Sequence, residues 1–445
     1  MAARLEFDVG FGPAKRRREE SVPMRLLLLG DFSGRQVSER PPLASRRALR
    51  VDVDSLDDVI GRLRPRLSLS TGEIAFARIA DFHPDQLATR LEVFKALEER
   101  RTHPRASNED LDRLLGKAPA VTALPTTAPP AHALDAFIHN IIAPHIVQDT
   151  SIETRTSLAG IEAAFADEMR ALLHVPAFQS LEAAWRGAHW LISSLELDEN
   201  LQLHLFDITR EELFADIVDA QRNVSETSLY RALVDGWRDV PGGEGWSAIA
   251  ALIDFGPSEA DIGVLAALGV IASRAGGPLL GGADRALAGE DREALAAWEA
   301  LRRSEAAPWI ALGTPRVLLR RPYGKRSDPI ETFPFEEFVG APVHEELLWG
   351  NAGLALALLI GRAFMARRWD MEPGDECEID DLPAYTFARD GQTEMQPGGE
   401  RSLTESEVAQ LLRAGLVPLA SRRDRHAVIA IRFQSIAAPP APLAW

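Results

Sequence analysis

The stretch from Gly116 to His132, GKAPAVTALPTTAPPAH, is the feature that most limits how this chain can fold. It holds four prolines and has neither helical nor strand periodicity. Because proline fixes φ and lacks a backbone donor, such a stretch is typical of a semi-rigid linker. We therefore predict a linker at 116–132, a smaller domain at 23–115, a larger domain at 133–445, and an N-terminal arm at 1–22.

Strand-like and helix-like segments alternate on both sides of this linker. In the smaller part, the apolar run Leu26–Leu29 predicts a buried strand, and Leu56–Leu63 and Pro84–Arg100 have helical spacing. The larger part predicts strands at Leu201–Phe206, Ile249–Phe255, Val317–Arg321 and Ala427–Phe433. Its helix candidates are Ala133–Val147, Ile152–Leu173, Phe178–Leu195, Glu211–Ala220, Ile262–Arg274, Asn351–Arg367 and Glu405–Ala414, and Gly276–Gly282 is expected to be a turn. This alternation predicts a mixed α/β (α+β) fold with two α/β domains.

Two segments are candidates for strand exchange between copies. Arg4–Phe11, RLEFDVGF, alternates strictly, with Leu5, Phe7, Val9 and Phe11 on one face. A strand on a tether can pair locally or add to the sheet edge of a neighbour. The second candidate is Ala427–Phe433, through Val428, Ile429, Ile431 and Phe433. For both segments, an ordinary strand within its own domain is the alternative.

The charge and the cysteine content narrow the classes of function. The net charge of −17 and the pI of about 5.1 argue against a nucleic-acid partner. Residues 1–50 are an exception, with 11 Lys and Arg against 6 Asp and Glu, so a basic arm could pair with an acidic copy or be solvated. Cys377 is the sole cysteine, which fits a reducing, cytoplasmic location. The longest apolar stretch, Ala352–Phe364, is too short to span a membrane and predicts a buried helix instead of membrane insertion.

Sequence patterns for catalysis are weak. The segment Gly30–Gly34 follows a predicted strand as a phosphate loop would, but neither GxxxxGK[ST] nor GxGxxG is present, and a tight turn is the alternative. The ten histidines form no metal-binding pattern, and one cysteine cannot build a thiolate zinc site. We therefore predict no catalytic residue, cofactor or metal. Trp185 is expected to pack in a helix interface, and Arg186 to pair with a buried carboxylate or reach a neighbouring subunit.

Several motifs resemble the sheath of type VI secretion systems. Met24–Arg35, MRLLLLGDFSGR, resembles the opening of the small sheath subunit (TssB). Phe178–Trp190, FQSLEAAWRGAHW, resembles the WRG helix of the large subunit (TssC), as do PRVLLRRPYG at 315–324, FPFEEF at 333–338 and LWGNAG at 348–353. The resemblance marks as structural Gly30, Asp31, Phe32, Ser33, Gly34, Trp185, Arg186, Gly187, Pro322, Tyr323, Gly324, Trp349, Gly350 and Asn351.

The resemblance implies a fused, shortened sheath protomer without enzymatic activity. Such sheaths are helical stacks of rings around an inner tube of Hcp protein, and they contract from a baseplate to drive the tube outward. Neighbouring protomers exchange strands, which would make Leu5, Phe7, Val9 and Phe11 the inward face of a donor strand, and an AAA+ unfoldase recycles contracted sheath. The small subunit's C-terminal elements and the large subunit's N-terminal arm have no clear counterpart, so ring linkage and recycling stay open. The rival hypotheses are a sheath-end or baseplate adaptor, the sheath of a phage-tail-like particle, and a nucleotide-dependent enzyme.

Overall fold

The computed structural model describes residues 22–69, 72–102, 150–221, 223–237, 245–291, 293–422 and 425–445. The expected strand Arg4–Phe11, the expected helix Ala133–Val147 and the predicted linker lie outside these residues. Among the described residues, no helix is both long enough and apolar enough to cross a membrane.

A nine-stranded sheet in the order β11-β15-β14-β8-β7-β6-β1-β5-β2 is the centre of the fold. Its six middle strands from β14 to β5 are parallel, whereas β2, β15 and β11 are antiparallel to their neighbours. The parallel strands are β1 (Met24–Gly30), β5 (Leu201–Asp207), β6 (Ala248–Phe255), β7 (Leu279–Ala283), β8 (Ile310–Thr314) and β14 (Val417–Ser421). The antiparallel strands are β2 (Leu49–Val51), β11 (Glu378–Ile379) and β15 (Val428–Ala430). The predicted mixed α/β fold is confirmed.

The two parts of the chain share this sheet and do not form one sheet each. Strand β1, from the smaller part, lies between β5 and β6 of the larger part, with Leu26 beside Leu203 on one side and Ala248 on the other. In the smaller part, the described residues contribute only β1 and the three-residue β2 to the main sheet. The domain boundaries around 116–132 stay a sequence prediction. The segments on either side of them pack in one shared hydrophobic core.

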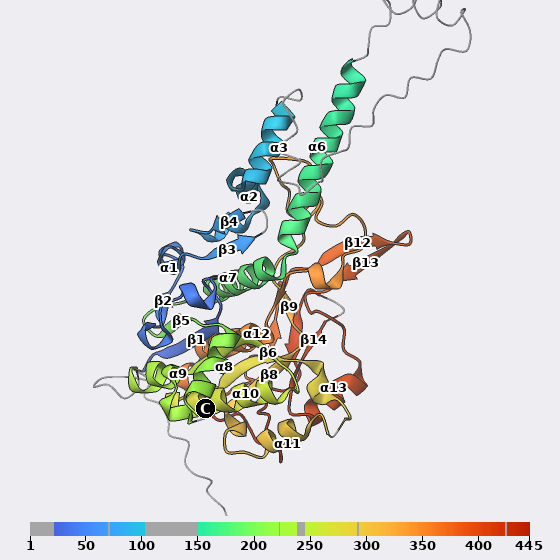
Figure 1. Cartoon of the computed structure of the whole chain (residues 1–445). Helices are drawn as coiled ribbons and strands as arrows, with labels where there is room; N and C mark the ends of the chain where they lie inside the picture. The colour runs from blue at the N-terminus through green and yellow to red at the C-terminus, as the bar shows by residue number, and fades with distance from the viewer. Residues whose placement is uncertain are drawn as a thin grey trace, which may run out of the picture.

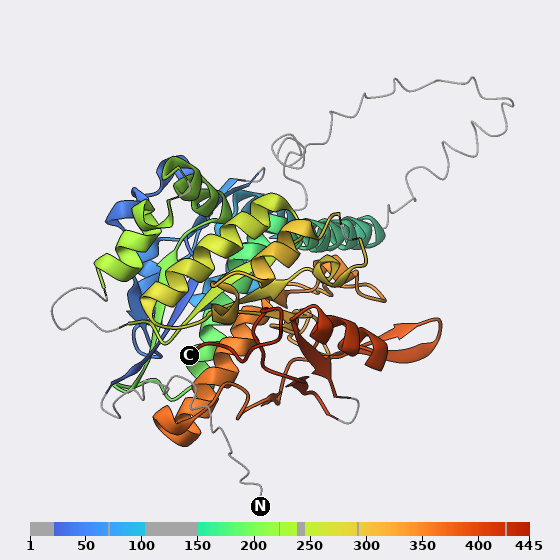
Figure 2. The ribbon, with the colours of Figure 1, turned by 90° about the horizontal axis from the view of Figure 1, so that it is seen from below.

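Helices cover both faces of the sheet, as Figure 2 shows. Leu26 and Leu28 pack in the core that holds α7 (Pro176–Ser194) and α12 (Ala352–Arg367). Leu27 and Leu29 point to the opposite core. That core holds α8 (Arg210–Asp219), α10 (Glu259–Ala275) and α11 (Ala296–Arg302). Burial of β1 on both faces explains its uninterrupted run of leucines.

Several elements extend away from the sheet. Helices α3 (Glu92–Thr102) and α6 (Thr150–Leu173) lie side by side and project from the body (Figure 1), where Phe94 stacks on Phe165 with ring centroids 5.4 Å apart. The hairpin of β12 (Tyr385–Arg389) and β13 (Gln392–Gln396) projects from the body in a different direction from α3 and α6 (Figure 1 and Figure 2). The other elements are β3 (Arg66–Leu69) paired with β4 (Gly72–Ala75), β9 (Val317–Leu318) paired with β10 (Trp349–Gly350), α1 (Leu56–Leu63), α2 (Pro84–Arg90), α9 (Ser228–Tyr230) and α13 (Glu405–Arg413).

Most of the predicted elements that lie in the described residues are confirmed, and four differ, one of them the strand predicted over Ala427–Phe433. The helix predicted over Pro84–Arg100 is broken at Leu91 into α2 and α3. The strand predicted over Val317–Arg321 pairs only at Val317–Leu318. The turn predicted at Gly276–Gly282 ends α10 with Gly276 at φ 106°, but strand β7 begins at Leu279.

The segment of the second candidate for exchange, Ala427–Phe433, forms a strand only at Val428–Ala430, which is β15. Val428 and Ile429 pair with β14 on one side and with β11 on the other. Ile431 and Phe433 lie beyond its end. Residues 428–430 thus pair with strands of their own chain, and exchange of this segment between copies stays a prediction.

Candidate functional site

The motifs of the two parts of the chain meet where β1 ends against helix α7. The indole nitrogen of Trp185 donates a hydrogen bond of 2.9 Å to the carbonyl oxygen of Phe32. Both side chains are fully buried, and their rings pack edge to face with centroids 5.2 Å apart. A buried carbonyl needs such a donor because water cannot reach it. This contact ties the segment after β1 to the helix that carries WRG.

The segment after β1 is a closed turn. The backbone N–H groups of Phe32 and Ser33 donate to Asp207 Oδ1 at 2.9 and 3.0 Å, and the Gly34 N–H donates to Asp31 Oδ1 at 2.7 Å. Gly34 has φ 61°, which favours glycine. A phosphate loop offers its amides to the ligand, whereas here carboxylates of the same chain accept them. The tight-turn alternative therefore describes Gly30–Gly34.

Arg40 neutralises the two carboxylates of this turn. Its guanidinium lies 2.6 Å from Asp31 Oδ1 and 3.2 Å from Asp207 Oδ1. Burial raises the pKa of Asp31, and the charge of Arg40 offsets part of that rise. Arg46 similarly pairs with Glu212 on α8 and donates to the carbonyl of Asp207 at 2.7 Å. These contacts fix the turn to strand β5 and α8.

Arg186 of the WRG motif joins a buried ion-pair cluster, which we call the arginine cluster. Its Nε lies 2.6 Å from Glu182 Oε1, and its Nη2 donates to the Tyr323 hydroxyl at 2.7 Å. Arg320 bridges Glu182 at 3.0 Å and Glu337 at 2.7 Å, and Glu337 also accepts the Tyr323 N–H at 2.7 Å. The expectation that Arg186 pairs with a buried carboxylate is thus confirmed within the chain.

The arginine cluster is built to stay charged. Burial raises the pKa of Glu337, but the charge of Arg320 and hydrogen bonds from His174, Arg320 and Tyr323 outweigh it and lower the pKa to about 2. Burial also raises the pKa of Tyr323 well above its ordinary range. Neither group therefore changes its protonation near neutral pH, as a general acid or base must. The cluster is suited to fixing α7 against the segment 320–337.

Three motif glycines allow close approach of neighbouring segments. A Cβ on Gly187 would lie 2.4 Å from Leu354 Cδ1, so α7 contacts α12 where only glycine fits. A Cβ on Gly324 would lie 2.2 Å from the Glu336 carboxylate, and one on Gly350 would lie 2.8 Å from the side chain of Leu319. Pro322, just before this turn, is buried, and its carbonyl accepts a hydrogen bond from the Ser327 hydroxyl.

Trp349 and Asn351 lie outside the arginine cluster. The Trp349 indole donates to the carbonyl of His344 at 2.8 Å. The Asn351 side chain caps α12 by accepting the Gly353 N–H at 2.8 Å, and its Nδ2 donates to Asp254 Oδ1 at 2.9 Å. Asn351 thereby joins α12 to the carboxyl end of β6.

Sequence reasoning missed the residues that complete these contacts. Glu182 could have been found, because it lies four residues before Arg186 on the same helix face. Arg40, Asp207, Arg320 and Glu337 acquire their roles only through long-range contacts. The donor-strand residues Leu5, Phe7, Val9 and Phe11 lie outside the described residues. Within the part of the chain that the structure describes, no three His, Cys, Asp or Glu side chains are grouped to hold a metal ion.

Two known protein families match the chain, one over each of its two parts. Residues 155–437 match the VipB family, described as EvpB/VC_A0108, tail sheath N-terminal domain. Residues 3–117 match the family described as Type VI secretion system, VipA, VC_A0107 or Hcp2. The chain belongs to the type VI secretion sheath proteins. It carries both sheath families on one polypeptide, so the resemblance of its two parts to TssB and TssC is confirmed.

Two curated relatives from Pseudomonas aeruginosa match this sheath protein. It is 27% identical to type VI secretion system sheath protein TssC1 over 345 residues, which covers 71% of this chain and 69% of TssC1. It is 27% identical to type VI secretion system sheath protein TssB1 over 109 residues, which covers 22% of this chain and 62% of TssB1. The motif cluster therefore joins, within one chain, segments similar to two separate sheath proteins.

Proposed function

We propose that this chain is a protomer of a contractile sheath that polymerises around an inner tube and contracts to propel it. The observation that carries the proposal is the position of β1, which lies between β5 and β6 and so makes the TssB-like and TssC-like segments one sheet. Membership of the sheath family implies self-association. A chain that carries both the TssB-like and the TssC-like segments fits a self-sufficient sheath.

The proposal includes partners and a location. They are an Hcp-like tube protein inside the sheath, a baseplate at its end, and an AAA+ unfoldase that recycles it in the bacterial cytoplasm. It assigns no catalytic step, since the turn at Gly30–Gly34 has its amides occupied by carboxylates. A sheath-end adaptor is the alternative, and it differs in forming no polymer.

Strand addition is the proposed means of linkage between protomers. The β12–β13 hairpin turns through Asp390 and Gly391, both at positive φ, and pairs with no third strand among the described residues. A two-stranded hairpin is marginal in water, so an added strand would stabilise it through backbone hydrogen bonds. The alternating segment Arg4–Phe11 of another copy is the proposed donor.

Negative-stain electron microscopy of the purified chain tests this proposal. We expect hollow tubes at rising concentration, with or without the tube protein. Monodisperse particles under all of these conditions would contradict a self-sufficient sheath and favour an adaptor. Deleting residues 1–12 tests the donor strand separately, because it should leave a folded monomer that forms no tubes. Unchanged tubes after the deletion would refute the donor role and leave the sheath role intact.

A further inference from the structure

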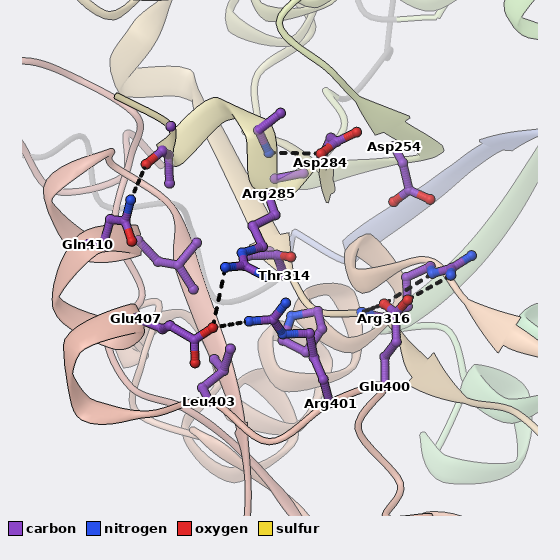
Figure 3. A pocket seen from close by; sticks show the side chains of 17 residues that line it. Asp254, Asp284, Arg285, Thr314, Arg316, Glu400, Arg401, Leu403, Glu407 and Gln410 are labelled. Carbon is purple, nitrogen blue, oxygen red and sulfur yellow. Dashed lines mark hydrogen bonds and ion pairs between the residues drawn. The ribbon is translucent and has the colours of Figure 1, made fainter. Parts of the chain in front are cut away.

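A hollow of about 640 Å³ lies at the carboxyl ends of β6, β7 and β8 (Figure 3), apart from the arginine cluster. The short helical turn Arg285–Ala288 and helix α13 form its walls, with the segment from Glu400 to Leu403. In sheets of parallel strands, ligands bind outside the carboxyl ends of the strands. The place of this hollow in the fold is therefore that of a binding site.

The lining of the hollow combines apolar surface with seven charged side chains, those of Asp254, Asp284, Arg285, Arg316, Glu400, Arg401 and Glu407. Its volume is within the range of small-molecule sites, in which polar groups orient the ligand. The apolar lining comes from Ala283, Ala286, Ala288, Pro315, Leu403 and Leu411. Such a lining suits a ligand that has an apolar part and one charged head.

Each of the three arginines of the hollow faces a glutamate, and two of them share Glu407. Arg316 donates two hydrogen bonds to the Glu400 carboxylate, from Nη2 at 2.7 Å and from Nε at 3.1 Å. Glu407 pairs with Arg401 and lies 3.5 Å from Arg285. An anionic ligand would have to displace one of these carboxylates, so the arrangement disfavours anions.

With Asp254 and Asp284, the hollow has four carboxylates against three arginines, a surplus of one negative charge. Asp254 and Asp284 line the hollow, and neither has an ion-pair partner within 4.0 Å in the described ranges. The carboxylate of Asp254 accepts a hydrogen bond from Asn351 Nδ2. Desolvation by the walls of the hollow raises the pKa of Asp254, the charge of Arg316 opposes that rise, and the carboxylates of Glu400 and Asp284 add to it.

The backbone makes room for this carboxylate. A Cβ on Gly282 would lie 1.9 Å from Asp254 Oδ1 and 2.5 Å from Asn351 Nδ2, so a side chain at 282 would expel both groups. The glycine thus allows Asp254 to stay at the edge of the hollow. Asp254 is exposed within the hollow, accepts one hydrogen bond from a neutral amide and has no ion-pair partner within 4.0 Å in the described ranges, so its carboxylate is accessible to a cationic ligand.

We propose that this hollow binds an organic cation, a guanidinium or primary ammonium group on an apolar chain, with Asp254 as its ion-pair partner. Asp284 adds to the negative potential, and the alanines and leucines contact the apolar part. A divalent metal fits poorly, because no three ligating side chains are grouped among the described residues. The site is independent of the proposed contraction, and the sheath family does not assign it.

The cation has two possible sources, a free small molecule or the basic run Lys15–Arg18, from this chain or from another copy. Val22 is fixed beside the start of β1 by the Trp369 indole, 2.6 Å from its carbonyl. Lys15 lies seven residues before Val22, a reach of at most about 25 Å, and the strands between Val22 and the hollow are about 20 Å long, so chain length does not separate the two origins of the run.

Isothermal titration calorimetry on the full-length chain at low salt tests the site, with L-argininamide as the probe. We expect binding that Asp254→Asn weakens at least about tenfold, the loss of one charged hydrogen-bonded pair. Asp284→Asn should weaken it less, and Asp219→Asn, an exposed aspartate on α8, should leave it unchanged. Circular dichroism checks that each variant is folded, and Asp284→Asn still tests the site if Asp254→Asn unfolds.

A second titration with a peptide of residues 13–21, PAKRRREES, distinguishes the sources. Peptide binding that depends on Asp254 identifies the basic run as the source, and binding of argininamide without the peptide identifies a free cation. No binding of argininamide by the wild-type chain would overturn the proposal. Equal binding by wild type and both hollow variants would overturn it as well.

Discussion

The indole nitrogen of Trp185 lies 2.9 Å from the carbonyl oxygen of Phe32, and this hydrogen bond crosses from the TssC-like segment to the TssB-like segment. The two residues are 153 positions apart in one chain. In the relatives, similar segments belong to two proteins, TssC1 and TssB1. A contact of this kind is therefore intramolecular here, and mutating it tests how the two segments of the chain are held together.

Replacing Trp185 with Phe should lower the free energy of unfolding by about 1–3 kcal/mol, because the buried Phe32 carbonyl loses its donor. Urea denaturation measures the loss. The matched control is Trp190→Phe on the same helix, where the ring is only half-buried. Equal losses in the two variants would show that the hydrogen bond to Phe32 contributes nothing.

Replacing Gly187 with Ala should destabilise the chain by about 1–3 kcal/mol, since the new methyl group collides with Leu354 and overpacks the contact between α7 and α12. The control is Gly160→Ala in α6, where a Cβ meets nothing within 4 Å. That change should stabilise the chain by about 0.5–1 kcal/mol through helix propensity. Thermal unfolding should show shifts of opposite sign, and a stabilising Gly187→Ala would refute the close contact.

Replacing Arg320 with Met should cost about 3–5 kcal/mol, because Glu337 and Glu182 are left buried without their shared counter-charge. Arg186→Met should cost less, since the Arg186 side chain is 23% exposed. Adding Glu337→Gln to Arg320→Met should restore part of the loss in urea denaturation. The account of the arginine cluster is wrong if the double variant is no more stable than Arg320→Met alone.

The pair of Glu400 and Arg316 should make stability depend on acid pH. Burial raises the pKa of Glu400, but hydrogen bonds from Arg316 and its charge outweigh this effect and lower the pKa from 4.5 to about 2. A lowered pKa stabilises the fold above the unfolded value, and the contribution is lost as pH falls from 4.5 towards about 2. Glu400→Gln should therefore be less stable than wild type at neutral pH, by about 2 kcal/mol.

The difference between wild type and Glu400→Gln should shrink as the pH is lowered through this range, measured by urea denaturation at each pH. The exposed Glu196→Gln serves as the control and should track wild type throughout. A constant difference between wild type and Glu400→Gln would show that the charge of Glu400 is not what stabilises the pair.

The sequence predicted which segments form strands and helices better than it predicted which of these elements lie side by side in the fold. Burial on both faces leaves a direct trace in the run of leucines of β1, but its partners β5 and β6 lie more than 170 positions away, and no local pattern encodes that pairing. The prediction of a turn over Gly276–Gly282 was wrong in part, because Gly281 lies in strand β7. A Cβ there would lie 3.1 Å from Leu312 and Phe255, so close packing and not turn geometry favours a glycine at this position.

The same distinction applies to the candidate site: contacts between residues close in sequence could be predicted, whereas contacts between distant residues could not. The spacing of Glu182 and Arg186 is local, so one ion pair of the arginine cluster was within reach of sequence reasoning. Arg320 and Glu337 meet Glu182 only after α7 docks on the segment 320–337. The β12–β13 hairpin was missed despite its Asp390-Gly391 pair, which is the strongest short-range hairpin signal.

The central claim is that the TssB-like and TssC-like segments form one folded unit, and cutting the chain between them tests it most directly. A protease site placed within residues 116–132 allows cleavage after folding, followed by size-exclusion chromatography and thermal unfolding at low concentration. The account predicts that the two fragments elute together and unfold in a single transition, because β1 is hydrogen-bonded on both edges by strands of the other fragment. Fragments that separate without denaturant would contradict it.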